Sequence, residues 1–389
     1  MNVLVGDFNN DNWDDIYVSN DFHDNDYYYL NNKDGSFSET NKKAFGHESR
    51  FSMGSDGADL NNDGWLDIVT MDMLPRDEKV LKSSAGDDPF EIYQYKMSYG
   101  YHNQYSRNCL QLNVGGGKYF SEIGLYSGIA ATDWSWAPLA ADFDNDGIKD
   151  LFISNGIVKR PNDLDYVKFV SSPAMLQSLE KGKTSDIIAI DKMPSGKVAN
   201  CMFQGQPDIK FIDRSKDWGF DEPTLSNGVA YADLDNDGDL DLIINNINSP
   251  AMMYKNNSRE RNKQSFLDIE LKGIGYNTNA YGAKVVIKNK GMLQLNYLTG
   301  SRGFLSSSTK IVHFGLGKEK NIDTLQVIWP SGKMQLLTNV KVNQRLTLKE
   351  ENASLLVKLC LPTDSVKREV LFYKDVTKEK GIYWKHQER

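Results

Sequence analysis

The chain has 389 residues, of which 40% are hydrophobic and 11% aromatic, so it is long enough for two or three domains with substantial cores. Its formal net charge of −8 argues against a phosphate-binding surface, because nucleic-acid footprints are basic patches, and no nucleic-acid partner is expected. No apolar run approaches the ~18 residues of a membrane-spanning helix, so no transmembrane segment is expected in this chain. Three cysteines without framework spacing predict small buried side chains rather than a disulfide scaffold.

One acidic loop recurs four times, with oxygen-bearing side chains at loop positions 1, 3, 5 and 9. In chain order these positions hold Asp7, Asn9, Asp11 and Asp15; Asp59, Asn61, Asp63 and Asp67; Asp142, Asp144, Asp146 and Asp150; and Asp233, Asp235, Asp237 and Asp241. A hard cation such as calcium takes about six to eight oxygens, and a short curled loop can supply most of them. Position 6 is glycine in three loops, which permits a sharp turn, and Asn12 in the first, which tolerates positive φ. We therefore predict up to four structural Ca²⁺ sites, with weaker binding in the first loop.

The residues after each loop distinguish this motif from the EF-hand. An EF-hand loop ends in a bidentate Glu at position 12 and runs into a helix. Position 12 here holds Val18, Thr70, Ile153 and Ile244. Each loop is followed by a short β-branched or aromatic run, which is typical of a buried strand, so the EF-hand is excluded and the loops lead into β-sheet.

A hairpin signal ending in an aromatic residue precedes the second, third and fourth loops. The distance from this aromatic residue (Phe37, Phe120 and Phe211) to the first Asp of the next loop is 22 residues each time. We therefore predict that hairpin and following loop form one repeated unit, and repeats made of several short strands indicate β-propeller blades. The stretches between them vary in length, so insertions are expected on one rim, at 72–107 and 156–205.

The same 22-residue spacing, extended past both ends of the chain, predicts that the chain is a fragment. It is expected to start inside a blade that lacks its outer hairpin and to stop inside another blade. Residues 373–382 copy the stretches that begin at Phe120 and Phe211. No signal peptide stands at residue 1, but a truncated start makes that uninformative. The chain is therefore expected to contain blades in 1–262 and, in 351–389, a linker and the start of a further blade.

Between these regions the acidic loops stop and a different β-rich segment begins. Strand-like runs are expected at 266–271, 283–288, 293–298, 311–314, 324–329 and 345–348, separated by turns. These runs predict a compact all-β module of 266–350 with the arrangement of a small sandwich. The fold class is therefore all-β: a partial β-propeller followed by a small sandwich-like module.

Two resemblances rest on these motifs. The acidic loops resemble the FG-GAP or VCBS repeats of integrin-type propellers. The later segment resembles an ASPIC/UnbV module through the stretches 279–284, 302–307, 313–317 and 327–333. The combination is similar to that of large exported bacterial proteins and covers nearly the whole chain. The resemblance implies calcium in the loops and an exported location.

The sequence carries no catalytic signature, and this agrees with a structural role for the calcium sites. Closed oxygen cages leave no open position for substrate, and neither metalloprotease, nucleophile-elbow nor phosphate-loop patterns occur. Extracellular calcium modules bind at roughly 10⁻⁴–10⁻³ M, which favours a location outside the cytoplasm, at the cell surface, in the periplasm or secreted. We expect a non-enzymatic scaffold that binds a protein or glycan partner. The alternatives are a polysaccharide lyase or hydrolase on the same propeller, or a purely structural repeat region of a larger exported protein.

The two insertions carry the candidate partner surfaces. The first contains five tyrosines between 93 and 105, which either form a glycan or partner surface or pack against one another within an ordered loop. The second contains a helix-like apolar pattern over 164–179, which is expected to pack on the propeller rather than bind a partner.

Overall fold

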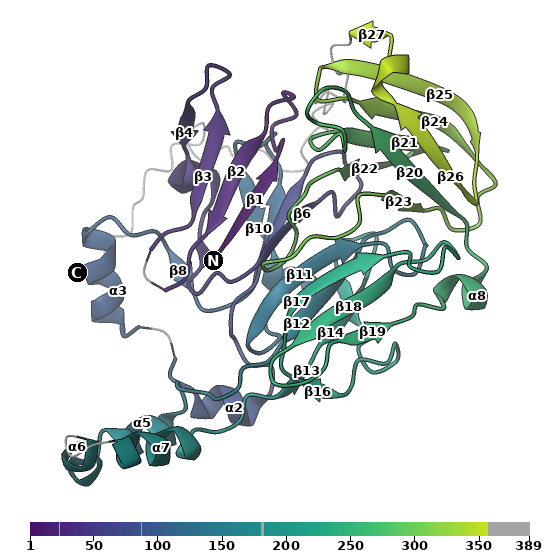
Figure 1. The fold of residues 1–389 in the computed structure, drawn as a ribbon. Coiled ribbons are helices and arrows are strands. Elements are labelled where there is room, and N and C mark those ends of the chain that lie inside the picture. Colours follow the sequence, from purple (N-terminus) through teal and green to yellow (C-terminus); the bar gives the residue numbers. More distant parts are fainter. Residues whose placement is uncertain (23, 87, 180–182, 357–389) are drawn as a thin grey trace, which may run out of the picture. The chain divides into compact units, whose positions relative to one another are not determined.

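The computed structural model describes residues 1–356 except 23, 87 and 180–182, and residues 1–356 form one compact unit (Figure 1). Strands dominate this unit, which confirms the all-β class. The further blade expected beyond residue 356 lies outside the described residues. No helix in the described part of the chain combines the length and the apolar character needed to cross a lipid bilayer.

Four antiparallel sheets, which we call blades 1 to 4, follow one another along the chain, each with an acidic loop between its first two strands. Blade 1 contains β1 (Asn2–Gly6), β2 (Asp15–Ser19), β3 (Tyr27–Asn31) and β4 (Phe37–Glu39). Blade 2 contains β6 (Ser55–Ala58), β7 (Asp67–Thr70), β9 (Cys109–Asn113) and β10 (Phe120–Glu122). Blade 3 contains β11 (Ser135–Ala141), β12 (Asp150–Asn155), β14 (Cys201–Gly205) and β15 (Phe211–Asp213). Blade 4 contains β17 (Ser226–Ala232), β18 (Asp241–Asn246) and β19 (Met252–Tyr254).

The sheet order corrects the predicted repeat unit. In blades 1 to 3 the hairpin that follows a loop joins the same sheet as that loop, because β3 pairs with β2, β9 with β7 and β14 with β12. The constant 22-residue stretch is therefore the crossing from the outer strand of one blade to the loop of the next. The prediction that the first blade lacks its outer hairpin was wrong, since blade 1 has all four strands.

Each pair of neighbouring blades encloses one hydrophobic core. The second residue of each of the first three loops, Phe8, Leu60 and Phe143, lies in the core between its blade and the next. Cys109 and Cys201 are buried free thiols in blades 2 and 3, as predicted. The loops therefore lie beside the contacts that hold successive blades together.

After blade 4 the chain forms two further sheets around one core. One sheet has the order β23 (Val312–Gly315), β20 (Phe266–Lys272), β26 (Gln344–Lys349). The other has the order β22 (Met292–Tyr297), β21 (Lys284–Asn289), β24 (Asn321–Ile328), β25 (Lys333–Lys341), β27 (Leu355–Leu356). Buried residues of both sheets, with Trp329 the largest, make one core, which is the arrangement of a sandwich. All six predicted strands are present, and β25 and β27 were missed. We call residues 266–356 the sandwich module.

One loop of the sandwich module runs along the inner strands of the blades. Gly303 forms an isolated antiparallel bridge with Ser55 of β6. Further along, Thr309 N donates to the carbonyl oxygen of Tyr231 in β17, and Val229 N of the same strand donates to Ser306 Oγ. We call residues 302–309 the axial segment, and it gives hydrogen-bond partners to inner-strand groups of blades 2 and 4.

The remaining short elements belong mostly to the connections. They are β5 (Glu48–Ser49) paired with β8 (Gln104–Tyr105), β13 (Val198–Ala199) paired with β16 (Pro223–Thr224), and the helices α1 (Asn41–Ala44), α2 (Glu78–Ser83), α3 (Phe90–Ser98), α4 (Gly124–Ser127), α5 (Leu164–Val170), α6 (Pro173–Leu179), α7 (Lys183–Lys192), α8 (Ser258–Asn262) and η1 (Glu350–Asn352). The helices expected in the second insertion are present. They contact one another and extend away from the blades (Figure 1). Apolar side chains such as Val167 and Leu176 stay exposed, so the expected burial against the propeller is not what the structure shows.

Candidate metal sites in the acidic loops

All four acidic loops adopt the same curled turn. The backbone N–H of position 5 donates to Oδ1 of the position 1 Asp at 3.0 to 3.1 Å in every loop. Position 6 has positive φ throughout, with Asn12 at 68° where the other loops have Gly64, Gly147 and Gly238 at 90 to 96°. Asn12 therefore makes the turn that glycine makes elsewhere, as expected of asparagine.

The carboxylate at position 9 ties each loop to its blade. In the second loop, Asp67 accepts the backbone N–H of Leu60 at 3.0 Å and that of Asn113, on the third strand, at 2.8 Å. Asp15, Asp150 and Asp241 accept equivalent pairs of backbone N–H groups. Each carboxylate oxygen keeps a second lone pair, so position 9 can hold the strand and still serve as a metal ligand.

In the third and fourth loops the carboxylates converge as a calcium site requires. Ligand oxygens of Asp142, Asp144 and Asp146 lie within 4.8 Å of one another, and so do those of Asp233, Asp235 and Asp241. The first two loops replace the position 3 carboxylate by Asn9 and Asn61, whose amide oxygens are also hard donors. The donor set is therefore all oxygen and mostly anionic, which fits calcium and does not fit a soft thiophilic metal. The sixteen loop residues remain predicted ligands.

Successive loops are also linked directly to one another. The side-chain amide of Asn10 donates to the carbonyl oxygen of Gly64 at 3.0 Å, that of Asn62 to Gly147 at 2.9 Å, and that of Asn145 to Gly238 at 2.9 Å. All of these asparagines stand at loop position 4 with φ between 55 and 62°. A distortion of one loop therefore reaches the next through a single hydrogen bond.

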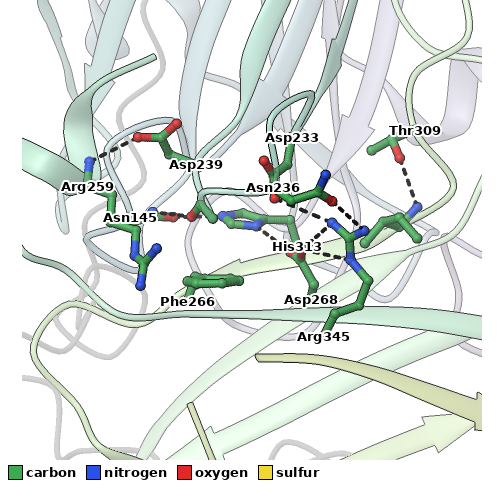
Figure 2. A network of polar contacts seen from close by, with 12 residues as sticks. Asn145, Asp233, Asn236, Asp239, Arg259, Phe266, Asp268, Thr309, His313 and Arg345 are labelled. Atoms are coloured by element: carbon green, nitrogen blue, oxygen red, sulfur yellow. Dashed lines mark hydrogen bonds and ion pairs between the residues drawn. The ribbon is translucent and has the colours of Figure 1, made fainter. Parts of the chain in front are cut away.

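Two basic residues of the sandwich module contact the loops at the ends of this row. Lys284 of β21 forms a buried ion pair with Asp7 of the first loop. Arg345 of β26 donates to Asn236 Oδ1 at 2.9 Å and lies 3.4 Å from Asp233, both in the fourth loop (Figure 2). Arg345 thus meets the one position 4 asparagine that has no following acidic loop in the described chain.

His313 makes the third contact between module and loops. Its Nδ1 lies 2.9 Å from Asp268 Oδ1 and its Nε2 lies 2.7 Å from Asn145 Oδ1 (Figure 2). Burial alone would raise the pKa of Asp268, but the bonds from His313 and Arg345 leave that pKa below its usual value. His313 therefore links Asp268 of the sandwich module to Asn145 of the third loop.

Sequence reasoning missed these linking residues. Lys284 and Arg345 carry no local signal, because their partners lie far away in the sequence. The position 4 asparagine did carry a signal, since Asn10, Asn62, Asn145 and Asn236 occupy the same place in all four loops. Invariance at a position that is not a metal ligand indicates a contact outside its own loop.

The loop carboxylates give a clear pH prediction for the metal-free protein. Burial raises the pKa of Asp15 and of Asp59 to about 7 and that of Asp146 to about 6. The native state then binds more protons than the unfolded state, so stability falls as pH rises through this range. We expect the melting temperature of the metal-free protein to rise by roughly 5 °C from pH 8 to pH 5.

The control for that pH effect is calcium. A bound divalent cation favours the ionised carboxylates, so calcium-saturated protein should show no such gain on acidification. Differential scanning fluorimetry of dialysed protein, with and without 10 mM CaCl₂, compares the two profiles. A metal-free profile that falls steadily from pH 8 to pH 5 would contradict the assignment.

Comparison with known proteins agrees with this architecture. Residues 7–70 match the FG-GAP-like repeat, and residues 273–355 match the family described as ASPIC and UnbV. The chain is 24% identical over 340 residues, 85% of its length, to cartilage acidic protein 1 of Xenopus tropicalis. It is 35% identical over 111 residues, 28% of its length, to cartilage acidic protein 1 of Homo sapiens. These matches span 42% and 16% of the two relatives, so the chain covers less than half the length of either.

Proposed function

Since the chain combines an FG-GAP-like repeat with an ASPIC and UnbV domain, as its sequence predicted, we propose that it is a calcium-stabilised scaffold that binds a protein or glycan partner. FG-GAP repeats indicate a scaffold of the β-propeller type. The observation that supports the calcium part is the row of four equivalent loops, linked through their asparagines, with carboxylate oxygens that converge in the third and fourth. Calcium in these loops would replace carboxylate repulsion by attraction and fix the angle at which each blade meets the next.

We place the protein outside the cytoplasm. The relatives are named after cartilage, a tissue whose bulk is extracellular matrix. Loops of this type bind calcium in the range of about 10⁻⁴–10⁻³ M in extracellular modules, and calcium at that level is found outside cells. The exported bacterial type stays a prediction, because these relatives are animal proteins.

The tyrosine-rich insertion offers the surface for the partner. The rings of Tyr95 and Tyr99, on and just after α3, lie 4.7 Å apart with their hydroxyl oxygens 3.0 Å apart. Both side chains are more than 60% exposed. The insertion thus packs its own aromatics and still exposes them, and an exposed aromatic pair with polar rims suits stacking on a sugar ring or a peptide.

The acids and bases that converge where the sandwich module meets the blades leave too little room for a sugar substrate. A polysaccharide-acting enzyme needs a deep pocket in which acids and bases converge around a sugar. Where the module meets the blades, a cavity lined by Asp142, Lys149, Tyr231, Arg302 and His313 measures only about 30 Å³. That volume suits one or two water molecules.

A glycan array probed with the whole chain tests the binding function. We expect retained glycans whose signal falls at least about tenfold in the double variant Tyr95→Ala/Tyr99→Ala, because stacking contributes most of the binding energy at such sites. Tyr276→Ala, which alters a fully exposed tyrosine of the sandwich module, is the matched control. Silence on the array would overturn the glycan part of the proposal and leave a protein partner to be sought.

A further inference from the structure

A further group of metal-binding side chains lies outside the acidic loops, in and beside blade 2. His47 stands just before β5, Cys109 is the first residue of β9, and Glu122 is the last residue of β10. One ligand atom of each residue lies within 4.8 Å of the other two. Cys109 is buried, and the side chains of Glu122 and His47 are 4% and 19% exposed. The group joins a thiol and an imidazole to one carboxylate, so its chemistry differs from that of the oxygen-only loops.

Backbone contacts hold these side chains in place. The side-chain amide of Gln111 in β9 donates to the carbonyl oxygen of His47 at 2.8 Å, which ties the crossing from blade 1 to the third strand of blade 2. The ring of His47 packs edge-on against that of Tyr105, with centroids 5.1 Å apart. Glu122 Oε1 accepts the backbone N–H of Leu110 at 3.2 Å, so the other oxygen, Oε2, is the one that faces His47 at 2.9 Å. The group is therefore positioned before any ligand arrives.

Arg107 lies against this group, but its contacts conflict with one another. Its Nη2 lies 2.9 Å from His47 Nε2 and 3.2 Å from Glu122 Oε2. An imidazole nitrogen carries either a proton or a lone pair. With a lone pair, His47 Nε2 accepts from Arg107 and repels the Glu122 oxygen; with a proton, it donates to Glu122 and repels the Arg107 N–H. A metal cation in place of the guanidinium removes this conflict, because the lone pair of His47 and the oxygen of Glu122 then both face the metal.

The guanidinium is also incompletely bonded. Arg107 Nε is buried and has no hydrogen-bond partner among the residues that the structure describes. A buried donor without a partner costs about 1 to 3 kcal/mol. The Arg107 side chain is 21% exposed, so it has a path to solvent. Arg107 is thus a cation that can leave the group at low cost.

Blade 3 shows what the same place looks like when it is only structural. Cys201 and Asp213 hold the corresponding positions on β14 and β15. Arg76 lies with its Nη1 3.6 Å from Cys201 Sγ and pairs through Nη2 with Asp213. No other His, Cys, Asp or Glu of the described chain completes a metal-binding group around Cys201. The cysteine, acid and arginine are therefore common to both blades, and His47 is what blade 2 adds.

We propose that His47, Cys109 and Glu122 form a zinc site, which Arg107 vacates when the metal enters. Zinc prefers nitrogen and sulfur ligands at about 2.0 to 2.3 Å in a tetrahedron, which places the ligand atoms roughly 3.3 to 3.8 Å from one another. Shifts of about 1 Å bring the observed atoms to this geometry.

Zinc binding at this site moves one proton and adds one link between segments. Burial raises the pKa of the Cys109 thiol, so zinc binding releases the thiol proton to solvent. A water molecule fills the fourth position. The metal ties the crossing that carries His47 to two strands of blade 2, independently of calcium in the loops.

Cobalt is the probe, because Co²⁺ takes the place of Zn²⁺ and is coloured in a tetrahedral thiolate site. The full 389-residue chain is titrated with Co²⁺ in calcium-saturated buffer, so that the acidic loops are already filled. We expect a thiolate-to-cobalt charge-transfer band that saturates at one equivalent and is abolished by one equivalent of Zn²⁺. Competition with a chromophoric chelator then gives the zinc affinity.

Four variants assign the site. Cys109→Ser should abolish the cobalt band, and His47→Gln should weaken zinc binding at least about tenfold, because each removes one ligand. Arg107→Gln should strengthen zinc binding at least about tenfold, because it removes a competing positive charge. Cys201→Ser is the matched control, since it alters an equally buried cysteine at the same place in blade 3, and it should change neither measurement.

Three results would overturn the zinc site. They are the absence of a thiolate band in the wild type, loss of that band in Cys201→Ser, and an unchanged zinc affinity in His47→Gln. Circular dichroism melts without metal show whether each variant folds. If Cys109→Ser does not fold, the partly exposed His47 and Arg107 still decide the matter, because their variants are expected to shift the zinc affinity in opposite directions.

Discussion

Removal of calcium is expected to lower the melting temperature of this protein by roughly 10 °C. If each loop binds at about 10⁻⁴–10⁻³ M, then 10 mM calcium stabilises the native state by about 1.4 to 2.7 kcal/mol per site, and four sites add up to several kcal/mol. The loops lie beside the blade cores, and Asn10, Asn62 and Asn145 link them, so their loss acts on all three blade junctions. Thermal melts in 10 mM CaCl₂ and in excess chelator measure the difference.

A single loop variant makes that experiment specific. Asp146→Ala removes one ligand of the third loop, and calorimetric titration should then find about one calcium fewer per chain than in the wild type. Asp165→Ala, in the exposed first turn of α5, removes an equal charge away from any loop and should change neither the number of bound ions nor the melting temperature. Identical melts with calcium and with chelator would contradict structural calcium.

Arg302→Ala is expected to destabilise the protein by about 3 to 5 kcal/mol, or roughly 5 to 10 °C in melting temperature. Arg302 Nη1 lies 2.9 and 3.1 Å from the two carboxylate oxygens of Asp56, and both partners are buried. Truncation of the arginine leaves the Asp56 carboxylate uncompensated inside the core. It also removes the bond that the same guanidinium donates to the carbonyl oxygen of Tyr297.

The control for this buried ion pair is an ion pair on the protein surface. Arg214 and Asp217 lie 3.4 Å apart with both side chains more than a third exposed, so Arg214→Ala should cost at most about 1 kcal/mol. The double variant Arg302→Ala/Asp56→Ala should recover part of the loss, because no buried charge then stays unpaired. Chemical denaturation of the wild type and these variants compares the costs. A cost for Arg302→Ala no larger than that for Arg214→Ala would refute the role of the pair.

Local chemistry made much of this fold predictable. The acidic loops, the strands after them and six strands of the sandwich module follow from turn residues and from alternation of apolar side chains. The assignment of hairpins to blades could not be predicted, because a constant 22-residue spacing is equally compatible with a unit inside one blade and with a crossing between two. Only the pairing of β3 with β2 decides between them.

The contacts around the candidate sites were beyond sequence reasoning for a different reason. Lys284 meets Asp7 across 277 residues, and Arg302 meets Asp56 across 246. Each of these residues sits in a segment whose own pattern predicts an ordinary strand or loop. In a sequence a buried ion pair appears only as two separate charged residues. That the two residues pair can be recognised only once the topology is known.

The axial segment has a consequence for the order in which the protein is made. A ribosome releases the blades before residues 302–309, yet Ser55 and Val229 of the inner strands find their partners in that segment. Pairing between residues so far apart in the sequence is slow, because the entropy cost of closing a long loop comes before the stabilising contacts can form. The growing chain therefore holds nearly complete blades whose inner edges stay unpaired, and stretches exposed in this way are prone to misassembly. Synthesis of residues 302–309 ends that interval, because the axial segment then supplies the missing partners in blades 2 and 4.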